Sequence, residues 1–167
     1  MTPLGGLPPL LDARSRVLIL GSFPSAASLA AQRYYAHRQN QFWPILAAIL
    51  DQPLTTLDYA AKQEAVKAAG IAIWDVYGQC VRDGSLDSAI RAAVPNDVAA
   101  LKDIAPQLQR VCFNGKTAGK FAQQLAAVGL EVTILPSTSP AYTLPLADKL
   151  EAWRQALAPF VLPRPAR

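Results

Sequence analysis

Four short apolar runs, separated by longer segments with helical spacing, constrain the fold of this chain more than any other feature. The runs cover residues 17–20, 71–74, 111–113 and 132–135. Gly21 ends the first run and Pro136 ends the fourth, because neither residue readily continues a strand. Apolar runs of this length, rich in β-branched residues, are typical of strands that are buried on both faces of a parallel sheet.

The segments between the runs predict helices with recognisable ends. The expected helices run from a Thr56 cap to about Ala69 before Gly70, from Asn96 or Asp97 to a point before Pro106, from Thr117 to Val128 before Gly129, and from Asp148 to Leu157 before Pro159. Strands that alternate with helices predict an α/β fold, here a three-layer α/β/α arrangement around a central four-stranded parallel sheet.

The chain has 167 residues, which suffices for one domain with a hydrophobic core but not for two of ordinary size. We therefore expect a single domain over residues 1–167, with an irregular lead-in at 1–14 and a frayed tail at 160–167. No apolar stretch reaches the roughly 18 residues of a membrane span, and the N-terminus lacks the pattern of a secretory signal. These features favour a cytoplasmic protein without a membrane partner.

Metal chemistry and a serine-protease-like triad are both disfavoured by the residue inventory. The chain has two cysteines, Cys80 and Cys112, and one histidine, His37, whereas a zinc or iron–sulfur site usually needs three or four such ligands. No acidic residue lies near the histidine in the sequence. We expect no metal and no cofactor. The net charge of +4 suits a polyanionic partner such as DNA.

In open parallel sheets, ligands bind beyond the carboxyl ends of the strands, so the residues that follow each run matter most for function. The first such loop is Gly-Ser-Phe-Pro-Ser at 21–25. Gly21 permits the close approach of a ligand and Phe23 can stack on a base. The alternative is a strand–turn–helix junction in which Ser25 caps the helix and Phe23 belongs to the core.

A second segment, residues 34–43, combines aromatic, amide, imidazole and cationic side chains within ten residues. Aromatic rings can sandwich a flipped base, Asn40 can position a water, and His37 or Arg38 can hold phosphates. The alternative is a helix that starts at Asn40, with Phe42 and Trp43 anchored in the core.

Two further groups of residues have equally open interpretations. In residues 136–141, hydroxyls and backbone N–H groups lie between two prolines and could grip a phosphate, or simply form a turn. Asp75 and Asn114 directly follow strands, so each could read the edge of a base or cap a turn. The sequence leaves open which of these two reads the base.

Together these segments resemble the uracil-DNA glycosylase superfamily, and most of all its hypoxanthine-DNA glycosylase branch. The resemblance rests on GSFPS at 21–25, YYAHRQNQFW at 34–43, IAIWDVYGQC at 71–80, FNGKTA at 113–118 and LPSTSPA at 135–141. They follow one another in the order that the family uses, over about residues 17–143. The first two segments are the most specific.

The resemblance implies a cofactor-free, monofunctional DNA glycosylase that hydrolyses the N-glycosidic bond of a deaminated base, hypoxanthine above all, and leaves an abasic site. It implies that Asn40 is catalytic, that Ser22, Phe23, Phe42, Asp75 and Asn114 hold the extruded base, and that Ser25, His37, Lys116, Ser137, Thr138, Ser139 and Ala141 bind DNA. The expected partner is DNA with a damaged base. We expect a monomer without an obligate protein partner, associated with the nucleoid when it acts.

Two departures from the uracil branches favour hypoxanthine over uracil. Residues 22–24 contain no Asp, Glu or Asn, so the water-activating residue of those branches is absent, and Ser137 stands where their most active members carry a histidine. The alternatives are a uracil or mismatch-type DNA glycosylase, an inactive DNA-binding module of the same fold, and a nucleoside hydrolase-like enzyme that acts on small molecules.

Overall fold

A computed structural model describes residues 2–164 and contains the parallel sheet that the apolar runs predict. Its strands are β2 (Val17–Gly21), β3 (Ile71–Asp75), β6 (Arg110–Asn114) and β7 (Glu131–Leu135), in the order β3-β2-β6-β7. β2 is central, because Val17 pairs with Ile71 on one side and with Arg110 on the other. The predicted fold class is confirmed.

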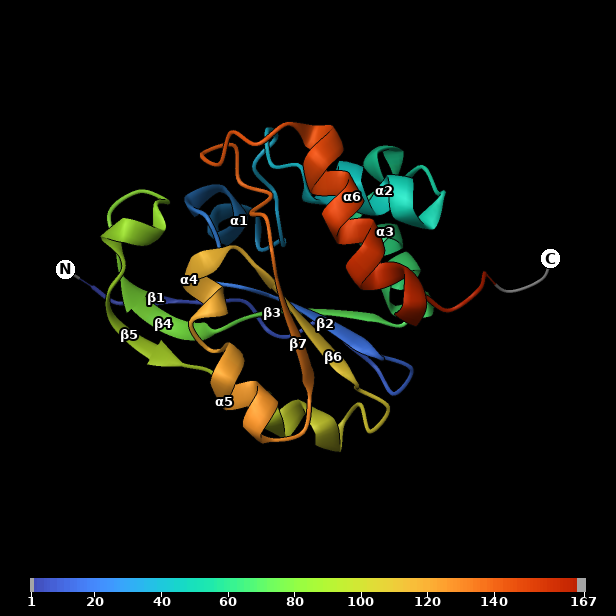
Figure 1. Ribbon diagram of the computed structural model, residues 1–167. Coiled ribbons are helices and arrows are strands. Elements are labelled where there is room, and N and C mark those ends of the chain that lie inside the picture. Colours follow the sequence, from blue (N-terminus) through green and yellow to red (C-terminus); the bar gives the residue numbers. More distant parts are fainter. Residues whose placement is uncertain (1, 165–167) are drawn as a thin grey trace.

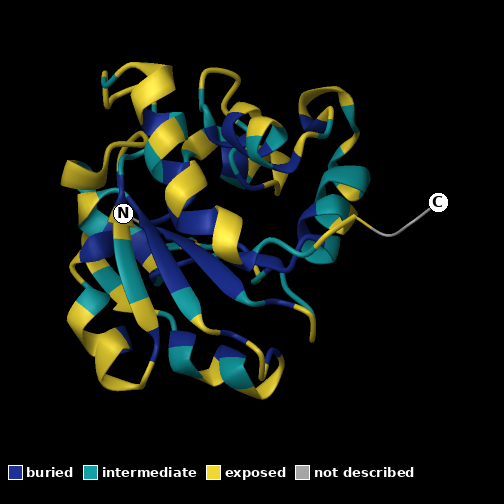
Figure 2. Ribbon diagram, turned by 45° about the vertical axis from the view of Figure 1, so that its right-hand side comes forward, coloured by how far each residue is buried: buried dark blue, intermediate teal, exposed yellow. Residues whose placement is uncertain are grey.

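Helices cover both faces of this sheet (Figure 1). One face packs against α2 (Phe42–Leu50), α3 (Tyr59–Ala68) and α6 (Leu146–Leu157), and the other against α4 (Lys116–Gly119), α5 (Ala122–Ala127) and the 3-10 helix η3 (Val98–Asp103). Because side chains alternate along a strand, Val17 and Ile19 enter the first core while Leu18 and Leu20 enter the second. Figure 2 shows the strands of this sheet largely buried and the helices exposed on their outer sides.

The ends of α3 differ from the expectation. Its N-cap is Asp58, whose carboxylate accepts the backbone N–H of Ala61 at 2.8 Å. Thr56 instead ends a 3-10 turn, η1 (Leu54–Thr56), because its hydroxyl donates to the carbonyl of Pro53 at 2.9 Å. The predicted cap was therefore two residues too early, and the carboxylate nearest the helix took that role.

Two other expected helices are less regular than their sequences indicate. The segment after Asp97 is the 3-10 helix η3, and the expected helix at 117–128 is divided into α4 and α5. The break falls at Phe121, whose ring lies edge-on to Tyr77 with centroids 5.5 Å apart. Gly119 meanwhile sits so close to β7 that a Cβ atom would lie 2.8 Å from Cδ1 of Ile134. Packing against the sheet thus overrides the local helical preference.

A second, antiparallel sheet was not predicted. It consists of β1 (Leu4–Gly5), β4 (Tyr77–Val81) and β5 (Arg91–Pro95), in the order β1-β4-β5. The lead-in at 1–14 is therefore not wholly irregular. At the other end, Leu162 donates its backbone N–H to the carbonyl of Ala69 at 2.9 Å, so the described part of the expected tail is docked; its last residues, 165–167, lie outside the described residues.

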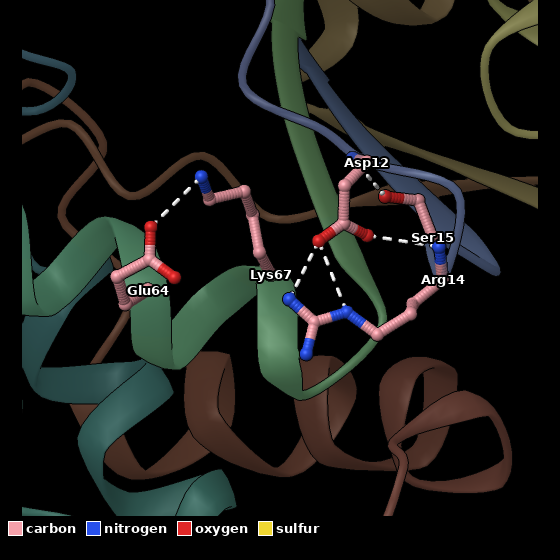
Figure 3. Close-up of polar contacts among 5 residues, drawn as sticks. All are labelled: Asp12, Arg14, Ser15, Glu64 and Lys67. Atoms are coloured by element: carbon pink, nitrogen blue, oxygen red, sulfur yellow. Dashed lines mark hydrogen bonds and ion pairs between the residues drawn. The ribbon is translucent and has the colours of Figure 1, made fainter.

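A tight turn leads the chain into the N-terminal end of β2, opposite to the end discussed below. The carboxylate of Asp12 accepts the backbone N–H of Arg14 at 2.8 Å and also pairs with the guanidinium of Arg14, while the hydroxyl of Ser15 accepts the N–H of Asp12 (Figure 3). An ion pair between Glu64 and Lys67 lies nearby on α3 (Figure 3). Within residues 2–164 no helix combines the length and the apolar character needed to cross a bilayer.

The aromatic cluster around Phe42 is the part of the core that supports the loops described below. Phe42 is fully buried, with ring centroids 3.9 Å from Tyr35, 5.0 Å from Trp43 and 6.0 Å from Trp153. We expect Phe42→Ala to lower the free energy of unfolding by about 3–5 kcal/mol, because it leaves a cavity that these rings cannot fill. Ile104→Ala, at a site that is 53% exposed, should cost less than about 0.5 kcal/mol. Urea denaturation measures both, and equal losses would contradict this view of the core.

Candidate active site

The loops that follow the strands of the central sheet surround a cleft of about 490 Å³. The order of the sheet reverses between β2 and β6, which is the point where open α/β sheets bind their ligands. The lining comes from Gly21–Ser25 with Ser28, from Tyr34, Tyr35, His37 and Asn40, from Asp75, from 85–88, from Asn114, and from 137–142. All but two of the predicted site residues line this cleft; Phe42 and Lys116 do not.

Phe42 lies beneath Tyr35, so the expectation that it stacks on the extruded base does not fit the structure. Their rings are stacked with an interplanar angle of 17°, and Tyr35 covers Phe42 from the cleft side. Tyr35 has a left-handed backbone with φ of 55°, which is unusual for a residue other than glycine and signals that its surroundings hold it there. The sequence carries no sign of this conformation, and the role of Tyr35 was missed. Lys116 is exposed at the start of α4, outside the cleft.

Asn40 lines the cleft and also bonds to the first residue of α2, so the helix starts two residues after the position that the helical alternative gave it. Its Oδ1 accepts the backbone N–H of Phe42 at 2.9 Å, and α2 begins there with Phe42 and Trp43 buried. Its own N–H donates to the carbonyl of His37 at 2.9 Å. These bonds fix the orientation of the carboxamide, whereas a carbonyl oxygen has two lone pairs, so one remains for a water in the cleft.

The carboxamide of Asn114 is occupied by contacts within the protein. Its Oδ1 accepts the N–H of Thr138 at 2.9 Å, while its Nδ2 donates to the hydroxyl of Thr138 at 3.0 Å and to that of Tyr35 at 3.2 Å. Both amide protons are thereby used, and Thr138 is only 1% exposed. Both residues line the cleft, and these bonds show that they also hold its loops together; their expected contacts with the base and with DNA stay predictions.

Asp75 has the opposite character, since it is buried beside the cleft and its Oδ2 has no hydrogen-bond partner in the described part of the chain. It pairs in register with Gly21, where a Cβ atom would lie 2.6 Å from Oδ1 of Asp75 and 3.2 Å from the hydroxyl of Tyr35. The absence of a side chain at Gly21 makes room for both groups. Asp75 is 5% exposed, and among residues 2–164 its Oδ2 has no hydrogen-bond partner. Burial, together with the nearby charge of Asp87, raises the pKa of Asp75 to about 7, against the opposing effect of Arg82.

One wall of the cleft is the loop at 136–142, which is stiffened from both sides. The hydroxyl of Ser137 accepts the N–H of Ser139 at 3.1 Å, and that of Ser139 accepts the N–H of Ala141 at 3.2 Å. From behind, the buried ammonium of Lys149 donates to the carbonyls of Tyr142 at 2.7 Å and of Ser139 at 3.3 Å. Burial lowers the pKa of Lys149. The serine hydroxyls accept these bonds, so their protons remain free to donate to an outside acceptor.

The facing wall is the connection between β4 and β5, which the sequence did not point to. Ser22 donates its hydroxyl proton to Oδ1 of Asp87 at 2.6 Å, and the hydroxyl of Ser85 accepts the N–H of Ala26 at 2.9 Å. A polar Gly-Ser-Leu-Asp-Ser stretch at 84–88 was the available signal, but it reads equally as an ordinary loop. The Ser22 hydroxyl proton is thus used within the protein, and the expected contact of Ser22 with the base stays a prediction.

Phe23 packs into the protein and Ser25 caps a helix, as the strand–turn–helix alternative for their loop predicts. Phe23 is 6% exposed, and the guanidinium of Arg82 lies 5.2 Å from its ring centroid. Arg82 itself is buried and donates to the carbonyls of Pro24 at 2.7 Å and Gly84 at 2.8 Å. Ser25 is the N-cap of α1 (Ala26–Ala31) and accepts the N–H of Ser28. Both Phe23 and Ser25 nevertheless line the cleft.

A family model for the uracil DNA glycosylase superfamily matches residues 8–158 of this chain. The chain belongs to this superfamily. A hypoxanthine DNA glycosylase of Methanosarcina barkeri is 38% identical over 151 residues, which cover 90% of this chain and 96% of that protein. A second protein of that name, from Methanosarcina acetivorans, is 38% identical over 136 residues, which cover 81% of this chain and 86% of that protein.

The fold of this superfamily member also matches a solved structure. The solution NMR structure of a candidate uracil DNA glycosylase from Methanosarcina acetivorans has a TM-score of 0.87 at 33% identity, over 95% of this chain and 99% of that one. The matched residues 8–158 include every segment that lines the cleft. Within residues 2–164 there is no group of three or more His, Cys, Asp or Glu side chains placed to hold one metal ion.

The buried ammonium of Lys149 should control the rigidity of the 136–142 loop. Lys149→Met keeps the length of the side chain but leaves two loop carbonyls without a donor, at a cost of about 1–3 kcal/mol. We expect the amides of Ala141 and Tyr142, which are bonded within the loop, to exchange with deuterium roughly tenfold faster. Lys120→Met, at an exposed lysine, is the matched control. Unchanged protection in the Lys149 variant would exclude this anchoring role.

The buried carboxyl of Asp75 should make stability depend on pH. Folding raises the pKa of Asp75 from 3.8 to about 7, so the folded protein binds this proton more tightly than the unfolded chain does. The free energy of unfolding therefore falls as the pH rises from about 4 to about 7, and it changes little above that range. Between pH 5.5 and 8.5 the free energy of unfolding should therefore fall by about 2 kcal/mol relative to Asp75→Asn, which does not ionise. Urea denaturation of both proteins at the two pH values gives this difference. A difference of zero or of opposite sign would refute the raised pKa.

Proposed function

We propose that this protein is a DNA glycosylase that excises hypoxanthine from DNA and leaves an abasic site. The observation that carries the proposal is the cleft at the switch point of the sheet, in which an oriented carboxamide, Asn40, and an unpartnered carboxyl, Asp75, lie among loops rich in hydroxyls. Two relatives at 38% identity, each aligned over most of this chain, bear the name hypoxanthine DNA glycosylase.

The reaction breaks the bond between C1′ of the deoxyribose and the base, and the base leaves with the electron pair. Positive charge develops on the sugar, and a water then adds its oxygen to C1′ and gives up a proton to solvent, while the departing base takes up a proton. A strongly electrophilic sugar needs an oriented water and not a strong base. The carbonyl oxygen of Asn40 supplies that orientation by accepting a hydrogen bond from the water.

The cleft also suits an extruded nucleotide and its flanking phosphates. Tyr35, supported from below by Phe42, offers a ring beside the base, and Phe23 lines the same space. The free hydroxyl protons of Ser137 and Ser139 and the exposed side chain of His37 face phosphates at the mouth, with Lys116 reaching the DNA from outside the cleft. We propose that the protein acts as a monomer on DNA in the cytoplasm.

Uracil is the second candidate base, because the structural neighbour at 33% identity bears the name uracil DNA glycosylase. The absence of an acidic or amide side chain at 22–24, and Ser137 in place of a histidine, favour hypoxanthine. Incubation of the protein with duplexes that hold one hypoxanthine or one uracil, followed by alkaline cleavage of abasic sites, measures both activities. Binding without cleavage would indicate an inactive module, and equal cleavage of free deoxyinosine would indicate an enzyme for small molecules.

The catalytic assignment rests on Asn40. We expect Asn40→Ala to lower the single-turnover rate of hypoxanthine excision by about tenfold or more while duplex binding stays within about twofold, because the carboxamide acts on the water and not on the DNA backbone. The neighbouring Gln39→Ala, at an exposed residue outside the cleft lining, should leave the rate unchanged.

Asn40→Ala also removes the hydrogen bond that its Oδ1 accepts from the Phe42 N–H at the start of α2, so the variant's folding needs its own measurement. Loss of one such bond costs about 1 kcal/mol, which thermal denaturation can detect. A fully folded Asn40→Ala protein with the wild-type excision rate would remove Asn40 from the mechanism.

A further inference from the structure

Asp75 is a buried acid that forms no ion pair with any of residues 2–164. Neither Arg82 nor Asn114 bonds to its side chain: the guanidinium of Arg82 donates to the carbonyls of Pro24 and Gly84, and the amide of Asn114 donates to Thr138 and Tyr35. Its Oδ2 is fully buried without a partner among residues 2–164, yet the residue lines the cleft. A buried polar atom without a partner calls for an explanation, and a ligand in the adjoining cleft can supply the partner.

We propose, on the basis of the proposed function, that Asp75 recognises the base as a neutral carboxylic acid, through one donated and one accepted hydrogen bond. The acid O–H donates to O6 of hypoxanthine, and the acid carbonyl accepts the proton on N1. This pair of bonds matches the lactam edge of the base, which presents an acceptor next to a donor. Uracil presents the same pair at O4 and N3, so Asp75 serves both candidate bases.

The ionised form of Asp75 cannot make this pair of bonds. A carboxylate only accepts hydrogen bonds, so it would place negative charge against the carbonyl oxygen of the base. Negative charge also builds up on the base as it leaves. The neutral acid instead offers a proton to that oxygen as the charge develops, which favours departure of the base.

The groups around Asp75 favour the neutral form. Two charged residues come from the β4–β5 connection: Asp87 adds negative charge, and Arg82 opposes its effect but is bonded to carbonyls. Tyr34 and Tyr35 come from the neighbouring segment, and burial raises the pKa of both phenols, so they stay uncharged. His37 lines the same cleft.

The test is the pH dependence of single-turnover excision from a hypoxanthine duplex between pH 5.5 and 9.5. We expect the wild-type rate to fall about tenfold per pH unit on a limb at or above pH 7, where Asp75 ionises. The Asp75→Asn side chain offers one donor and one acceptor at every pH. Its excision rate should therefore show no such fall above pH 7, whatever the absolute rate of the variant. Asp97→Asn, at an exposed acid outside the cleft, should keep the wild-type profile.

Each outcome of this test has a defined meaning. A falling limb that persists in Asp75→Asn, or a wild-type rate that rises with pH, overturns the neutral-acid role while leaving the glycosylase function in place. Absence of excision at every pH, with duplex binding intact, overturns the proposed function and this inference with it.

Proton uptake provides a second readout that does not depend on turnover. Calorimetry of the Asn40→Ala protein with a hypoxanthine duplex at pH 8.5, in two buffers of different ionisation enthalpy, should show uptake of up to one proton per complex. The uptake should be absent when Asp75→Asn is added. Equal uptake in both proteins would overturn the proposal even if the variants are slow.

Discussion

The hydrogen bonds of the Asn114 carboxamide are the constraint on which the geometry of the cleft depends. One side chain at the end of β6 bonds to Thr138 in the loop after β7 and to Tyr35 in the loop before α2. These two loops are far apart in the sequence, and Asn114, which joins them, is buried. Bonds of this kind are costly to leave unmade inside a protein, so they specify one arrangement of the loops.

This arrangement explains why two polar residues at neighbouring strand ends have different roles. Asn114 and Asp75 both follow apolar strands and look interchangeable in the sequence. In the folded protein both amide protons of Asn114 donate to groups of the protein, whereas among residues 2–164 Oδ2 of Asp75 has no partner. This difference depends on the bonds of Asn114 to Thr138 and Tyr35, which lie 24 and 79 positions away in the sequence. A local sequence pattern cannot contain such contacts.

The four central strands and most of the cleft lining could be predicted because they rest on local signals. Apolar runs mark strands that are buried on both faces, and the residues after them had to meet at one edge of the sheet. The antiparallel sheet escaped prediction because β4 and β5 lie at a partly exposed surface with little alternation. Phe42 and Tyr35 were misjudged for a different reason: which of two nearby rings faces the cleft depends on a left-handed backbone at Tyr35.

Arg82 and Lys149 hold the two walls of the cleft by main-chain carbonyls, and neither pairs with a carboxylate within residues 2–164. Every amino acid carries that carbonyl, whatever its side chain. The bond from Lys149 to position 142 therefore does not depend on which side chain stands there. Tyr142 is 44% exposed and lines the cleft, so a substitution at this position can change the surface of the cleft without releasing the loop from its anchor.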